Sequence, residues 1–280
     1  MPTSGVRFVN NNGDYSARVA DMPPIWGLAQ TDGLILALRP RASDNSLIDL
    51  SASNATITKK GTVGYTANAV SGDRDNGLMT TVAEPLSYTM LVTCRLTATS
   101  DWVATGDLPA AGTWTNATGS DTDRGGLLGF AISAVAGGNA TLKSSMRHFL
   151  AGGTFQTLDI SSETISVGTR SSSWRMLAIQ VNAATEQIIR QRCGNVGSIA
   201  TYQGAAGSLS TRLLAHPTTG ITTKFEVGSV PLFGLSALGS GAKAEVAEIL
   251  VFNTVLSQQT IDAQYALTKA GMAALGLTLA

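Results

Sequence analysis

The sequence is poor in charge, in cysteine and in long apolar runs. Charged residues make up 14% of the 280 residues, and 19 basic residues balance 19 acidic ones. General nucleic-acid binders and binders of anionic membranes rely on excess positive charge, so this balance argues against both classes. No stretch approaches the ~20 consecutive apolar residues of a membrane-spanning helix.

The few residues suited to covalent or acid–base chemistry are also poorly placed for it. Cys94 and Cys193 both lie in segments that we expect to be strands, either as buried thiols or as a disulfide pair. His148 and His216 are the two histidines, and neither lies near a nucleophile elbow. The first residues, 1–5, lack a basic region followed by an apolar one, so we expect no classical signal peptide.

What the chain does contain is a series of short apolar runs separated by Gly, Asn and Asp. The clearest lies between Tyr88 and Leu96, where every second residue is apolar and can share one face of a strand. Thr89, Thr93 and Arg95 lie on the other face, which we expect to be nearer solvent. Many such strands predict an all-β fold of two antiparallel sheets in a sandwich.

A buried strand followed by a helix is predicted near the end of the sequence. Residues 246–252 are apolar at nearly every position, which indicates a strand with both faces buried. Ser257 is a good N-cap for a short helix from Gln258 to about Ala270. The apolar residues of this helix can bind it to the body of the domain; they are Ile261, Tyr265 and Leu267.

The N-terminal residues, 1–30, are predicted to form an extended arm ahead of a domain that spans residues 31–280. Pro23 and Pro24 favour extended backbone, while Ile25 and Trp26 are too apolar for a free tail. Two interpretations remain open. The arm packs on the chain's own sandwich, or it docks on a neighbouring subunit and serves in assembly.

The stretch from Ser100 to Gly126 is interpreted as a long inserted loop, and long loops in compact domains are often functional. A carbohydrate site combines aromatic platforms with planar polar groups, and this stretch holds candidates of both kinds. They are Trp102, Trp114, Asn116 and Arg124. The alternative is that the two tryptophans pin the loop to the body.

Several segments appear in the order of a known fold family. Asp49-Leu50-Ser51 precedes the Tyr88–Leu96 strand, the segment 174–178 begins with Trp and ends with Ala, and 247–257 forms a closing strand and turn. Over roughly residues 30–270 the chain resembles the concanavalin-A-like lectin/glucanase, or laminin-G-like, jelly roll. We expect Asp49 to hydrogen-bond the loop that follows it.

The resemblance implies two kinds of chemistry to look for. Laminin-G-like domains often hold Ca²⁺ through oxygen ligands, and the candidate donors are Asp121 and Asp123, or else Asp73, Asp75 and Asn76. Solvated loop acids are the alternative. A glucanase needs two facing carboxylates. Glu245 and Glu248 are three residues apart, so a regular strand would point them to opposite faces.

A jelly roll with an extended arm and no signal peptide is similar to tail, fibre or decoration proteins of tailed bacteriophages. The resemblance implies a non-enzymatic virion protein, made in the host cytoplasm. Its arm would bind other virion proteins and its lectin-like module a host-surface glycan. Such proteins are commonly trimeric, so we expect a homo-oligomer. A free carbohydrate-binding lectin is the alternative, ahead of a glycoside hydrolase.

Overall fold

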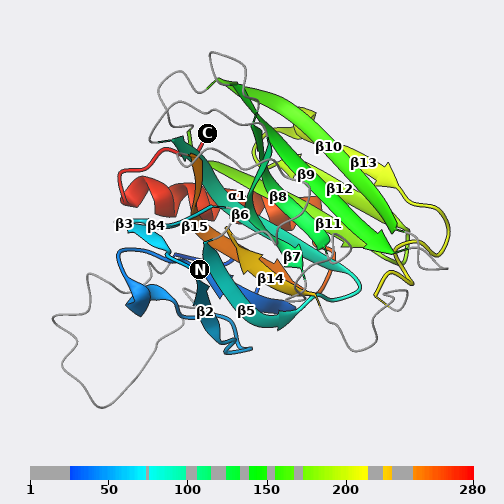
Figure 1. The fold of residues 1–280 in the computed structure, drawn as a ribbon, viewed down its shortest axis with the longest axis horizontal. Helices are drawn as coiled ribbons and strands as arrows, with labels where there is room; N and C mark the ends of the chain where they lie inside the picture. Colours follow the sequence, from blue (N-terminus) through cyan, green and yellow to red (C-terminus); the bar gives the residue numbers. More distant parts are fainter. Residues whose placement is uncertain are drawn as a thin grey trace.

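The computed structural model describes residues 26–73, 76–98, 106–114, 124–132, 139–149, 155–166, 173–213, 223–228 and 242–280. These residues form two antiparallel β-sheets that pack face to face, with one α-helix on the outside (Figure 1). The sandwich predicted from the short apolar runs is therefore confirmed.

The first sheet has the long strand β15 near its centre. Its spatial order is β13 (Ala200–Gln203), β12 (Gln187–Arg192), β11 (Arg175–Asn182), β6 (Tyr88–Ala98), β15 (Ala242–Phe252), β4 (Ala69–Gly72) and β3 (Gly64–Thr66). A further strand, β1 (Leu34–Leu38), pairs with the second half of β15, beyond β4. Two short 3-10 helices, η2 (Asp44–Ser46) and η3 (Val196–Ser198), lie in its connections.

The second sheet contains the strands of the middle of the chain. Its order is β10 (Phe155–Ser166), β9 (Asn139–Phe149), β8 (Arg124–Ile132), β7 (Gly106–Trp114), β14 (Lys224–Val227), β5 (Gly77–Ala83) and β2 (Ile57–Lys60). Strand β7 and the first residues of β8 lie inside the stretch interpreted as one long loop, so that interpretation was wrong for residues 106–114 and 124–126. The segment is rich in Gly and Ala and contains Pro109, which sits at a register shift against β8.

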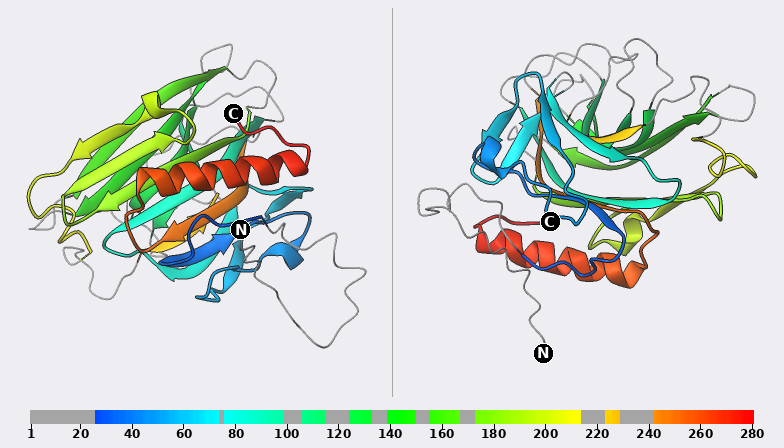
Figure 2. Two further views of the ribbon diagram at one scale, coloured as in Figure 1. Left: turned by 180° about the vertical axis from the view of Figure 1, so that it is seen from behind. Right: turned by 90° about the horizontal axis from the view of Figure 1, so that it is seen from below.

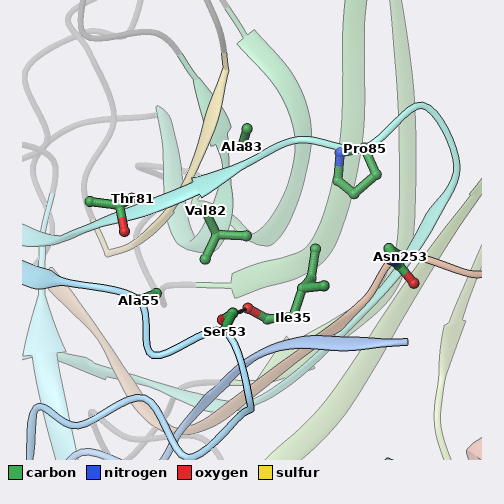
Figure 3. A pocket seen from close by; sticks show the side chains of 8 residues that line it. All are labelled: Ile35, Ser53, Ala55, Thr81, Val82, Ala83, Pro85 and Asn253. Atoms are coloured by element: carbon green, nitrogen blue, oxygen red, sulfur yellow. Dashed lines mark hydrogen bonds between the residues drawn. The ribbon is translucent and has the colours of Figure 1, made fainter. Parts of the chain in front are cut away.

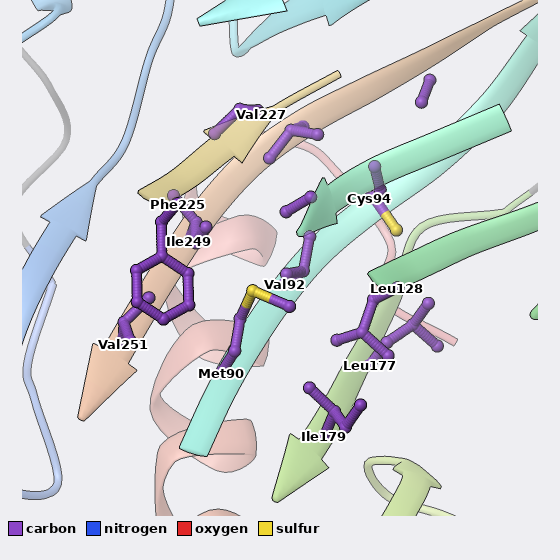
Figure 4. Packing of buried hydrophobic residues seen from close by; sticks show 14 of the residues in the cluster. Met90, Val92, Cys94, Leu128, Leu177, Ile179, Phe225, Val227, Ile249 and Val251 are labelled. Carbon is purple, nitrogen blue, oxygen red and sulfur yellow. The ribbon is translucent and has the colours of Figure 1, made fainter. Parts of the chain in front are cut away.

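The interface between the two sheets is the main hydrophobic core. The apolar face of β6 points into it, as the alternation of apolar residues from Tyr88 to Leu96 predicted (Figure 4). The rings of Tyr88 and Phe225 meet edge to face, with centroids 5.4 Å apart and an interplanar angle of 86°. One contact in this region joins the backbones of the two sheets. A Cβ atom on Gly72, at the end of β4, would lie 2.8 Å from Gly228 Cα, just after β14.

The opposite face of β6 is buried as well, which corrects a prediction. Thr89 and Thr93 are fully buried, while Arg95 remains partly exposed. The reason is the helix α1 (Gln258–Ala274), which covers this face of the first sheet and forms a second apolar cluster with it (Figure 2). That cluster includes Leu91, Leu250, Phe252, Ile261 and Met272.

Helix α1 begins where its cap predicted. Ser257 Oγ accepts a hydrogen bond from Thr260 N at 3.1 Å, which satisfies one free N–H group at the start of the helix. Ile261 is fully buried and Tyr265 is half-buried, whereas Leu267 is 36% exposed and lies against Gly27. Within the described residues, no helix is long and apolar enough to cross a membrane.

The two cysteines are free and buried, on different faces of the first sheet. Cys94 lies in the core between the sheets, and Cys193 lies in the cluster beneath α1. Burial raises the pKa of each thiol to about 12. The first of the two interpretations, a pair of buried thiols, is confirmed.

Candidate functional site

The structure brings two predicted carbohydrate-site residues together at one end of the second sheet. Trp114 ends β7 and Arg124 begins β8, and the two are direct partners across this strand pair. Lys224 of β14 is the partner of Trp114 on its other side. The three residues therefore form one row across three neighbouring strands. Lys224 was not predicted from the sequence, because no local pattern links it to a segment 110 positions earlier.

The remaining residues predicted for this region lie outside the described part of the chain. They are Trp102 and Asn116 of the carbohydrate site, and Asp121 and Asp123 of the calcium site.

The two described residues among the alternative calcium donors, Asp73 and Asn76, are hydrogen-bonded in their own loop. Asp73 Oδ1 accepts hydrogen bonds from the backbone N and the Nδ2 of Asn76, and Asn76 Oδ1 accepts one from Thr62 N at 2.6 Å. These oxygens close the loop between β4 and β5, while Asp75 lies outside the described residues. No group of three or more His, Cys, Asp or Glu side chains suited to a metal occurs among the described residues.

Glu245 and Glu248 lie on the same face of β15, not on opposite faces as regular alternation predicted. Glu245 is the partner of Arg95 and Glu248 is the partner of Thr93, two residues apart on β6. A register shift between Val246 and Glu248 inserts one extra residue into β15, and this β-bulge changes the alternation. Both carboxylates face the side of the sheet that carries α1.

Neither carboxylate is free for acid–base chemistry. Arg95 Nε lies 2.7 Å from Glu245 Oε2, and the same guanidinium lies 4.8 Å from the ring centroid of Trp174. Arg39 Nε lies 2.8 Å from Glu248 Oε1, and these two side chains are only 3% and 1% exposed. A glycosidase pair needs one carboxyl that can donate a proton and one that can attack or activate water. Two carboxylates held by guanidinium groups match neither role.

The buried Glu248 carboxylate joins four segments of the chain. Beyond its ion pair with Arg39, Oε1 accepts from Trp26 Nε1 at 3.0 Å, and Oε2 accepts from Thr268 Oγ1 of α1 at 2.8 Å. Gln264, one turn earlier in α1, donates to Thr268 and accepts from Ala29 N. We call this set the Glu248 network. It fixes α1 and residues 26–29 onto the first sheet.

Trp26 is held on its own domain. Its carbonyl oxygen accepts from Arg39 Nη1 at 2.9 Å, and the Arg39 guanidinium lies 4.5 Å from the centroid of its ring. A Cβ atom on Gly271 would lie 2.4 Å from the ring, so only glycine at this position of α1 admits the indole. For Trp26 the structure matches the interpretation of packing on the chain's own sandwich, while Ile25 lies outside the described residues.

Asp49 organises the loop that follows β1, as predicted. Its two carboxylate oxygens accept hydrogen bonds from Ala37 N, Ser51 N, Ser51 Oγ, Ser53 Oγ and Ala55 N, all between 2.8 and 2.9 Å. Burial raises the pKa of this carboxyl, but the backbone N–H groups outweigh burial and hold the pKa below its ordinary value. The charged carboxylate thus ties loop 50–55 to β1.

A pocket opens next to this loop, where the first and second sheets separate. Its volume is about 390 Å³, at the small end of the ~300–1,000 Å³ range of ligand pockets. Its lining comes from β1, loop 50–55, β5, the turn after β5 and the turn after β15 (Figure 3). The lining residues are Ile35, Ser53, Ala55, Thr81, Val82, Ala83, Pro85 and Asn253. This pocket could not be predicted from local sequence patterns, because its lining residues span more than two hundred positions.

Comparisons with known proteins support the fold. No protein-family model and no curated protein matches this chain. Among solved structures, the binding domain of botulinum neurotoxin DC in complex with SialylT is similar over 84% of this chain and 52% of that chain. The TM-score is 0.51 and the sequence identity 14%. The same domain in complex with rat synaptotagmin II gives a TM-score of 0.53, over 85% and 52% of the two chains, at 14% identity.

These neighbours are β-sandwich binding domains with a lectin-like jelly roll, so the predicted fold class is confirmed. Identities near 14% show the fold alone. The chain spans about half the length of the structures that it matches.

Proposed function

We propose that this chain is a non-catalytic binding module that recognises a surface carbohydrate through the end of the β7–β8 strand pair. The observation that carries the proposal is the row of Lys224, Trp114 and Arg124 across β14, β7 and β8. Tryptophan offers an apolar ring face, while arginine and lysine offer N–H donors and positive charge. This combination suits a glycan that carries hydroxyl and acidic groups.

Two further observations support a binding role over a catalytic one. The neighbouring solved structures are binding domains in complex with SialylT and with rat synaptotagmin II. The two carboxylates that could resemble a glycosidase pair, Glu245 and Glu248, are both engaged by arginines.

The more specific form of the proposal places the module in a bacteriophage particle, as a tail, fibre or decoration protein. Residues 1–30 would bind other virion proteins, and the sandwich would be the exposed part of a homo-oligomer such as a trimer. Support comes from the sequence resemblance, and from the Glu248 network, which would hold the base of such an arm firmly on the sandwich.

The carbohydrate site is tested by replacing both Trp102 and Trp114 with alanine. We expect binding to a glycan array and to host cells to be lost, with an unchanged melting temperature. Lys224→Ala should weaken binding of acidic glycans, whereas the matched variant Lys60→Ala, on β2 of the same sheet, should not. Full binding by the double tryptophan variant would overturn the proposed site.

The arm is tested by deleting residues 1–25, which leaves Trp26 in place. We expect the shortened protein to be lost from particles and to have the solution mass of a monomer, with the fold of the sandwich intact. A monomer that binds glycan equally well with and without these residues would favour the free lectin over the virion protein.

A further inference from the structure

We propose that the pocket between β1 and β5 binds the acetamido group of an N-acetylated sugar. The proposal rests on the proposed carbohydrate-binding function and deepens it by naming a sugar class. The pocket lies at the rim of the sandwich (Figure 3). It adjoins the row at the end of β7–β8, because its lining residue Ala83 is the strand partner of Lys224.

The floor of the pocket is apolar and partly buried. Ile35, Ala55 and Val82 pack against the core between the sheets, and Pro85 is half-buried beside them. A sugar hydroxyl placed against such a floor would lose its hydrogen bonds to water without replacement. The methyl of an acetamido group forms no hydrogen bonds with water, so its burial against the floor lowers the free energy.

The rim of the pocket offers two polar groups with hydrogen-bonding capacity to spare. Thr81 Oγ1 accepts from Thr56 N at 3.1 Å, which leaves its hydroxyl hydrogen to donate. The side-chain amide of Asn253 forms no hydrogen bond with any other described residue, and it is exposed at the mouth of the pocket. An acetamido group presents one N–H donor and one carbonyl acceptor, and the side-chain amide of Asn253 can hydrogen-bond with it. Thr81 lies at the other end of the pocket (Figure 3), where its hydroxyl can donate to another group of the same sugar.

Ser53, the third polar lining residue, has no such capacity. Its hydroxyl lies 2.6 Å from Ile35 O, 2.8 Å from Asp49 Oδ2 and 2.8 Å from Ser51 Oγ.

The lining carries no charged side chain, so the pocket favours a neutral group. Two carboxylates close to the lining along the chain, Asp49 and Glu84, are engaged elsewhere. Asp49 is held by the loop after β1, and Glu84 pairs with Arg212 at 3.0 Å and accepts from Thr223 Oγ1. No aromatic ring lines the pocket either, so an unsubstituted hexose finds no stacking surface there.

The pocket is formed before any ligand binds. Arg212 donates to the carbonyl oxygens of Pro85 and Leu86 at 2.7 and 2.6 Å, which fixes the wall that follows β5. Ser53 Oγ fixes the opposite wall to β1, and Asn253 N donates to Gly33 O at 2.8 Å. A site whose walls are held by hydrogen bonds on each side needs little ordering when it binds.

The experiment compares N-acetylated glycans with counterparts that carry a hydroxyl in place of each acetamido group. One pair is N-acetylated chitotriose and cellotriose, and a second pair is built from N-acetylgalactosamine and galactose. We expect the full-length protein to bind at least one N-acetylated member about tenfold more tightly than its counterpart. Asn253→Asp keeps the shape of the side chain but replaces an N–H donor by a negative oxygen. It should abolish this preference.

Asn182→Asp is the matched control, because Asn182 only accepts hydrogen bonds in its turn and an aspartate can do the same. Ala83→Leu, at an exposed lining position, should remove the preference by filling the pocket. Equal affinity for both glycan classes, or an unchanged preference in Asn253→Asp and Ala83→Leu, would overturn the pocket proposal. If the Trp102/Trp114 variant still lost all glycan binding in that case, the proposed function would stand without the pocket.

Discussion

The two faces of the first sheet are buried by different means. The inner face, against the second sheet, is apolar along β6 and β15. The outer face, against α1, combines apolar contacts with the buried ion pair and hydrogen bonds of the Glu248 network. Apolar contacts favour burial but accept many arrangements, whereas each hydrogen bond of the network requires one position. We infer that the inner face provides most of the stability and the outer face fixes where α1 and residues 26–29 lie.

The largest expected loss of stability follows from disrupting the outer face. Arg39→Ala leaves the Glu248 carboxylate buried without its cation, which should lower the free energy of unfolding by about 3–5 kcal/mol in urea denaturation. Arg95→Ala removes the partly exposed ion pair with Glu245 and should cost about 1 kcal/mol or less. Equal losses in both variants would contradict the view that burial makes the Arg39 pair critical.

A cavity in the inner face should cost less than the unpaired charge. Leu96→Ala removes buried methyl groups from the core, with an expected loss of about 3 kcal/mol. Leu96→Met nearly conserves volume and should cost less than about 1.5 kcal/mol. On the outer face, Glu248→Gln also conserves shape, yet it should cost more than Leu96→Met because Arg39 loses its counter-charge. The reverse order would remove the distinction between the faces.

The cysteines report separately on the two faces. Each thiol pKa is raised by burial to about 12, so at pH 8–10 the reactive thiolate forms only in molecules that have opened. Detachment of α1 is enough to expose Cys193, whereas Cys94 requires separation of the sheets. We expect Cys193 to react faster with a thiol reagent, and Arg39→Ala to widen the difference. Equal rates measured by mass spectrometry would show that both faces open together.

The same thiols give stability a dependence on alkaline pH. The pKa of each thiol in the folded protein lies above its ordinary value of about 8.5. The neutral thiols therefore make their full contribution to the free energy of unfolding at any pH below about 8.5. It is lost as the pH rises from there towards about 12. In urea denaturation at a series of pH values, the free energy of unfolding of a Cys94→Ala/Cys193→Ala variant should fall less over this range than that of the unmodified protein.

The smallest expected effect is at the start of α1. Ser257→Ala removes the hydroxyl that caps Thr260 N and should lower stability by about 1 kcal/mol. Ser257→Asp keeps an acceptor at this position and serves as the control. A loss in thermal denaturation that is equal for both variants would mean that the cap is not the cause.

Local patterns predicted much of the fold, and failed where distant contacts decide the structure. The apolar alternation of β6 and the cap at Ser257 were readable because their signals lie within a few residues. Strand β7 was missed because its Gly, Ala and Pro residues disfavour a strand, and pairing with β8 and β14 on both sides overrides that preference.

The same limit applies to the candidate sites. Trp114 and Arg124 were predicted together because they are close in the sequence, but their strand pairing and the addition of Lys224 depend on the sheet. The bulge in β15 that brings Glu245 and Glu248 to one face leaves no mark in the amino-acid pattern. The rim pocket depends on the packing of two sheets, which no local pattern records.

The contact between Gly72 and Gly228 has a consequence for evolution. A side chain at either position would collide with the backbone of the other sheet, and Gly228 also adopts a positive φ of 74°. Neither glycine can therefore be replaced by another residue, even where the surrounding loops change in length and composition. Distant descendants of this protein should retain both glycines, some 156 positions apart here, followed by a closing strand and a serine-capped helix. This pair is a signature by which relatives could be recognised after overall sequence similarity has been lost.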